Sequence, residues 1–147
     1  MEKGITSING FNPIPFGPLM LAGLLAGAGS TVANLLLASF ASAIFSVPES
    51  FRPFNFFPIL AACLGSSLGA AGLFSIFERI SKHPKRSFNR AALVLLVLSF
   101  ILPGSLVRPG SADLPGIGWE IAGTLMLMHI IAAWVSMRAV NRLVPDS

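Results

Sequence analysis

Charged side chains are scarce in this sequence and make up 11% of its 147 residues. Soluble domains carry about 25%, so this chain has too little charge to cover a soluble surface. It also has one cysteine, Cys63, which excludes an internal disulfide. Because Cys63 lies in an apolar segment, we expect it to be a small, buried packing residue.

The sequence also lacks the residue patterns that carry chemistry. It has no paired carboxylates within an apolar segment, no Ser/His/Asp set, no metal-spaced cluster and no phosphate-binding glycine loop. The glycines between Gly65 and Gly72 fall inside an apolar helix, which excludes a nucleotide loop. The cations lie at segment ends and form no basic stripe with aromatics, which argues against nucleic acid. We therefore predict a protein that is not an enzyme and binds no nucleic acid.

Apolar segments dominate what remains, since 54% of the residues are hydrophobic. They predict an all-α fold, an integral membrane four-helix bundle formed by a single domain over residues 1–147. The expected spans are residues 19–45, 58–77, 91–107 and 117–140. The first is too long for a signal peptide, so we expect it to persist as a transmembrane helix. The third is the shortest, and Pro103-Gly104 interrupts it.

A dense basic stretch, residues 78–90, joins the second and third spans and is predicted to be a cytoplasmic loop that contacts lipid headgroups. Its cations are Arg79, Lys82, Lys85, Arg86 and Arg90. With this loop in the cytoplasm, only Arg52 and Arg108 among the ten basic residues fall on the other side. The positive-inside rule therefore predicts that both termini are cytoplasmic.

Small residues mark candidate packing faces, because transmembrane helices associate through close backbone approach and polar groups. The first span has Gly23 and Gly27 on one face, with Asn34 further along. The second span has a stripe that consists of Gly65, Gly69 and Gly72. These faces are predicted to pack against each other or against a partner chain, and Asn34 is predicted to form an interhelical hydrogen bond.

His129 is the ionisable residue that lies near the middle of a predicted span, and such residues are functional-site hypotheses. A neutral imidazole there could ligate the metal of a haem or a (bacterio)chlorophyll, or relay a proton. The alternative is a hydrogen bond to a polar side chain of a neighbouring span. The candidates for that bond are Asn34, Ser66, Ser67 and Ser99.

The second half of the chain, about residues 75–140, resembles an uncharacterised family of small four-span bacterial membrane proteins. The motifs that carry the resemblance are His83-Pro84-Lys85-Arg86-Ser87-Phe88, then Leu98-Ser99 with Pro103, then Leu125-Met126-Leu127-Met128-His129. The resemblance implies four helices and a bacterial inner (plasma) membrane, and it implies no activity. It also suggests that His129 belongs to a family pattern.

These observations favour an accessory or structural subunit that packs into a larger membrane complex, with lipid and other membrane subunits as partners. One alternative is a tetrapyrrole-binding subunit of an electron-transfer or light-harvesting complex, with His129 as the ligand. Another is a small homo-oligomeric transporter. Its polar path would be lined by Ser30, Asn34, Ser66 and Ser67.

Overall fold

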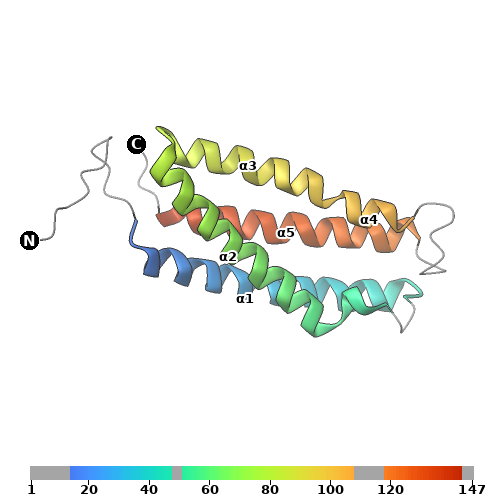
Figure 1. Cartoon of the computed structure of the whole chain (residues 1–147). Helices are drawn as coiled ribbons and strands as arrows, with labels where there is room; N and C mark the ends of the chain where they lie inside the picture. Colours follow the sequence, from blue (N-terminus) through green and yellow to red (C-terminus); the bar gives the residue numbers. More distant parts are fainter. Residues whose placement is uncertain (1–13, 48–50, 108–117, 144–147) are drawn as a thin grey trace, which may run out of the picture.

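The computed structural model describes residues 14–47, 51–107 and 118–143, and these residues form helices and no strands (Figure 1). The elements in chain order are α1 (Phe16–Ile44), the 3-10 turn η1 (Arg52–Phe54), α2 (Phe56–Ile80), α3 (Pro84–Ser99), α4 (Ile101–Ser105) and α5 (Trp119–Leu143). If α3 and α4 count as one segment, four helices are long and apolar enough to cross a membrane. The predicted all-α, four-span architecture is confirmed. Arg108 and Lys3 lie outside the described residues.

Helices form here because the apolar runs must satisfy their backbone hydrogen bonds internally when lipid surrounds them. α1 follows Pro15, which cannot continue a helix toward the N-terminus, and it ends where Phe45 adopts an extended conformation. Its 29 residues span about 44 Å, which exceeds the ~30 Å hydrocarbon core. The helix must therefore tilt or extend beyond the core.

The prediction of a loop over residues 78–90 is wrong for most of that stretch. α2 continues to Ile80 and α3 begins at Pro84, so only residues 81–83 connect them. Proline suits the first turn of a helix because the amide it lacks has no intrahelical partner there. The basic residues therefore lie on the end of α2, on the start of α3 and in the short turn between them. The third span starts earlier than the predicted residue 91.

The third span is interrupted, as predicted, but the break lies at Phe100 and precedes Pro103-Gly104. Pro103 has no N–H to donate to the carbonyl of Ser99, and its ring crowds that carbonyl. The Phe100 amide donates to the Val97 carbonyl at 3.2 Å, a tighter turn than that of an α-helix. The helical conformation resumes at Ile101, where α4 begins.

α2 and α5 both contact every other span of the bundle: α5 contacts α1, α2, α3 and α4, and α2 contacts α1, α3 and α5. α1 and α3 make no contact with each other within the described residues. Figure 1 shows α2 running obliquely across the bundle, from the start of α3 to η1. The beginning of α1 and the end of α5 lie at the same end of the bundle as the α2–α3 turn.

Two apolar clusters form the core, one toward each end. The cluster near η1 consists of Ala38, Phe51, Ile59, Cys63, Ile121, Leu125 and Met128. The cluster near the α2–α3 turn consists of Leu19, Ala71, Phe74, Phe88 and Val140. The predicted burial of Cys63 is confirmed, since its exposed fraction is 2%.

Candidate functional site

Between the two apolar clusters lies a layer of buried small and polar side chains, which is the most unusual feature of the interior. Ser30, Asn34, Ser67 and Ser136 are all buried there. The Ser67 and Ser136 hydroxyls lie 2.8 Å apart and hydrogen-bond α2 to α5. Ser136 is also 2.7 Å from the Ala132 carbonyl, so it donates to its own helix and accepts from Ser67. This leaves the pair fully satisfied without water.

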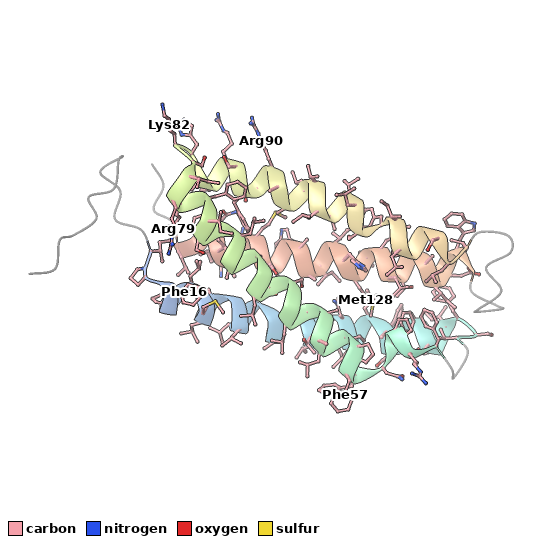
Figure 2. All side chains as sticks on the ribbon, in the orientation of Figure 1. Phe16, Phe57, Arg79, Lys82, Arg90 and Met128 are labelled. Carbon is pink, nitrogen blue, oxygen red and sulfur yellow. The ribbon has the colours of Figure 1, made fainter. Side chains whose placement is uncertain are left out.

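Asn34 makes the interhelical hydrogen bond that its position predicts. Its Nδ2 donates to the backbone carbonyl of Met128 on α5 at 3.3 Å and to Sγ of Cys63 on α2 at 3.3 Å. Met128, labelled in Figure 2, is itself buried. One amide thus joins three helices, while its Oδ1 is buried without a hydrogen-bond partner.

Gly23 and Gly27 of α1 lie directly against α2, in the arrangement expected of a close-packing face. A Cβ on Gly23 would meet the Ser67 carbonyl oxygen at 3.2 Å and Ala71 Cβ at 3.3 Å. A Cβ on Gly27 would approach Cδ2 of Leu64 to 2.7 Å and its Cα to 3.0 Å. Only glycine allows the two backbones to come this close.

The glycine stripe of α2 does not take part in this contact, which corrects the expectation that it packs on α1. A Cβ on Gly65, Gly69 or Gly72 would meet no atom of residues 14–47, 51–107 or 118–143 within 4 Å. The face of α2 that packs inward carries Ile59, Cys63, Ser67, Ala71 and Phe74. Gly65 and Gly69 are each two residues from members of that face, about 200° around the helix. Packing of the stripe against a partner chain stays a prediction.

His129 is half-buried on α5, and its Nδ1 lies 2.7 Å from the Leu125 carbonyl of the same helix. A carbonyl oxygen only accepts, so Nδ1 carries the proton and the lone pair is on Nε2. The predicted alternative, a bond from His129 to Asn34, Ser66, Ser67 or Ser99, is wrong. Ser99 donates to the carbonyl of Leu96, within its own helix.

Of the four residues proposed to line a transport path, Ser30, Asn34 and Ser67 lie in the buried layer, but Ser66 does not. Ser30 is buried and donates to the Ala26 carbonyl of its own helix. Ser66 is exposed on the outer side of α2 and donates to the Cys63 carbonyl. Ser67 faces inward toward Ser136. The four candidates therefore do not line one path through this chain.

The basic residues gather at the end of the bundle where α1 begins. Figure 2 shows Arg79, Lys82 and Arg90 at the end that also carries Phe16, with Phe57 at the opposite end. Arg86 is exposed like those three cations. The turn itself is held by a hydrogen bond between the Ser81 and Ser87 hydroxyls at 2.8 Å. Which side of the membrane this end faces stays a prediction.

No group of three or more His, Cys, Asp or Glu side chains that could hold a metal ion occurs within residues 14–47, 51–107 and 118–143. The comparison with protein families matches residues 15–146 to a model described as a family of unknown function, DUF6069. The match reaches well beyond the second half of the chain and includes α1 and α2. No curated protein and no solved structure matches the chain.

Proposed function

We propose that this chain, which belongs to the DUF6069 family of unknown function, is a non-catalytic accessory subunit of a larger complex in a bacterial inner membrane. The observation that supports this proposal is the outward-facing stripe of Gly65, Gly69 and Gly72. Four apolar helices make the chain a multi-pass membrane protein, and the stripe supplies a surface on which a further helix can pack.

The three glycines contact no other helix among the residues that the structure describes, although each weakens α2. Glycine in a helix interior costs about 1 kcal/mol relative to alanine. In lipid, the compensating gain is close approach by another helix, because small residues four apart allow the backbones to touch. Ala62 and Ser66 are also exposed on α2 and widen this small-residue surface.

The partner we propose is a transmembrane helix of a different membrane protein. The test compares Gly69→Leu with the matched control Gly123→Leu, which also points into open space. Gly123 is a suitable control because Trp119 and Leu127, one turn away on each side, are exposed and bulky and prevent close approach. Both variants should fold like the wild type, since a Cβ at either position would meet no atom of the described residues within 4 Å.

The measurement is native electrophoresis of membranes extracted with mild detergent, followed by determination of subunit stoichiometry. Wild type and Gly123→Leu should migrate in a complex with a second polypeptide in fixed ratio, and Gly69→Leu should migrate free. Retention of Gly69→Leu in the complex would refute the proposal. A complex built only of copies of this chain would support the homo-oligomeric alternative in its place.

His129 supports a second candidate, a subunit that binds a haem or a (bacterio)chlorophyll. The hydrogen bond from Nδ1 to the Leu125 carbonyl orients the ring and leaves the Nε2 lone pair for a metal. Ala122 and Ala133, on the same face of α5, are small. When bound, such a group would supply electron transfer or light absorption, and Nε2 of His129 would be the nitrogen that holds its metal.

The test of this candidate is the absorption spectrum of the complex purified from native membranes. We expect His129→Ala to lose a visible band that the control His83→Ala keeps, because His83 is exposed in the α2–α3 turn. A colourless wild-type complex, or a band that survives His129→Ala, would rule out ligation by His129.

A further inference from the structure

A cavity of about 170 Å³ lies between the beginning of α1 and the end of α2. It belongs to the end of the bundle where Figure 2 shows Phe16 and Arg79. Its described lining residues are Ile14, Pro15, Phe16, Ser75, Glu78 and Arg79. It is larger than the ~30 Å³ share of one water and smaller than the about 300–1,000 Å³ of a site for a drug-sized ligand. The cavity therefore has room for a small polar group of a larger ligand.

Glu78 is held in place at the wall of this cavity. Its Oε1 accepts a hydrogen bond from the Ile14 amide at 3.2 Å. Ile14 also packs against the apolar cluster near the α2–α3 turn, so two contacts tie the segment before α1 to α2. The second carboxylate oxygen, Oε2, has no hydrogen bond to the residues that the structure describes. A positioned carboxylate thus keeps one acceptor for a ligand.

The described lining of the cavity carries one charge of each sign. Glu78 supplies the negative charge and Arg79 the positive charge. Side chains of successive helical residues do not face each other, and Arg79 is exposed while Glu78 is half-buried. The two charges are therefore presented at separate points. A ligand that complements both has a cation and an anion next to each other.

The cavity lies at the depth of the lipid headgroups. The 25 residues of α2 span about 38 Å, which exceeds the ~30 Å hydrocarbon core. Glu78 is two residues from the last residue of α2, Ile80, and Ser75 is nearly one turn further from that end. Phe16, whose side chain is 62% exposed, adds apolar surface to the lining. A headgroup can therefore enter the cavity while its acyl chains stay in the bilayer.

We propose that this cavity binds the headgroup of phosphatidylethanolamine, a lipid with a primary ammonium and a phosphate. The ammonium donates to Oε2 of Glu78, and the phosphate lies beside the guanidinium of Arg79. A primary ammonium has three N–H donors, and its bond to a carboxylate is charge-assisted. The quaternary ammonium of phosphatidylcholine has no N–H, so the site distinguishes the two lipids. The proposal depends neither on the glycine stripe nor on His129.

The experiment measures lipid binding to the purified full chain in mild detergent by native mass spectrometry. The probes are phosphatidylethanolamine, its N-methyl and N,N-dimethyl derivatives, and phosphatidylcholine, all with the same acyl chains. Affinity should fall along this series by about tenfold or more, since a hydrogen bond to a charged group contributes at least about that factor. Equal affinity for the first and the last lipid would overturn the proposal. The series needs no variant, so it remains a test if a variant fails to fold.

The matched variants are Glu78→Gln and Glu120→Gln, which remove the same charge. Glu78→Gln should abolish the preference for phosphatidylethanolamine, while its amide oxygen can still accept from the Ile14 amide. Glu120→Gln, in the first turn of α5 at the other end of the bundle, should keep the preference (Figure 1). Arg79→Gln should weaken both lipids alike, because both carry the phosphate. A preference that survives Glu78→Gln, or one that Glu120→Gln removes, would refute the assignment of Glu78.

Two further arms identify the source of the ammonium. Soluble O-phosphoethanolamine carries the same two charges without acyl chains, and at equal concentration it should not displace the lipid. Displacement would overturn the proposal, because the soluble headgroup would then be sufficient. Lys3→Gln should bind phosphatidylethanolamine as the wild type does. Binding that appears only in Lys3→Gln would also overturn the proposal, because an ammonium of the same chain would then occupy the site.

Discussion

Single residues decide how closely α1 and α2 approach. Apolar side chains in lipid are already out of water, so the hydrophobic effect does not drive helices together there. Contact between helices depends on van der Waals packing and hydrogen bonds. Gly23 and Gly27 let the α2 backbone touch α1, and Asn34 then reaches both Met128 and Cys63. The close contact and the amide bond therefore support each other.

Gly27→Leu should destabilise the chain itself and not only an assembly. Even a Cβ at this position would approach Cδ2 of Leu64 to 2.7 Å, so the two helices would have to separate. Overpacking of this kind costs about 1–3 kcal/mol or more. Thermal unfolding of the purified chain in detergent, followed by circular dichroism, measures the loss.

Gly29→Leu is the control for this prediction, because Gly29 is on the same helix and a Cβ there would meet no atom of the described part of the chain within 4 Å. Its unfolding temperature should stay close to that of the wild type. Equal stability of Gly27→Leu and Gly29→Leu would contradict the contact between Gly27 and Leu64.

Among the four membrane-spanning segments, the one that consists of α3 and α4 is the least buried. Apart from Phe88, the residues of α3 are half-buried or exposed. Phe88 is fully buried and packs edge-on against Phe74 of α2, with 5.4 Å between ring centres. α3 is thus attached to the bundle chiefly at its first two turns.

Phe88→Ala should release the start of α3 from α2. Loss of a buried phenylalanine costs about 3–5 kcal/mol in soluble cores, and we expect about 3 kcal/mol here because the lost contribution in lipid is packing alone. Hydrogen exchange in detergent should rise over residues 84–92. The control Leu95→Ala, at a position 55% exposed, should leave exchange unchanged. Unchanged exchange in Phe88→Ala would contradict this attachment.

For the whole molecule, the distribution of cations sets the expected orientation. The end that carries Arg79, Lys82 and Arg90 is the end where α1 begins (Figure 2). The positive-inside rule predicts that this end faces the cytoplasm. Asn55, between η1 and α2, lies at the other end and is exposed.

Cysteine labelling in intact cells tests this orientation. In a Cys63→Ala background, Asn55→Cys should react with a membrane-impermeant maleimide from outside. His83→Cys, in the basic turn, should react only after the membrane is permeabilised. Neither substitution alters a Lys or Arg, so the charge balance that orients the chain is kept. The opposite labelling pattern would show that the termini are outside.

The positions of the spans followed from the sequence, but their packing faces did not. The apolar runs predicted four helices, and the ends of the third were misjudged because charged residues are compatible with a helix that extends beyond the hydrocarbon core. α2 carries small residues on two faces, Cys63 with Ser67 and Ala71 on one, and the glycine stripe on the other. The glycine stripe predicted the wrong face of α2 for the contact with α1.

The sequence by itself determined that the chain lies in lipid and that its fold is helical. Little charge, four long apolar runs and clustered cations permit only helices in a membrane, because backbone groups in lipid must bond within the segment. Only the tertiary structure decided which small face is used and which carbonyls Asn34 and His129 reach. In lipid every face of a helix is apolar, so periodicity cannot mark the inside, and shape and hydrogen bonding between distant segments choose it.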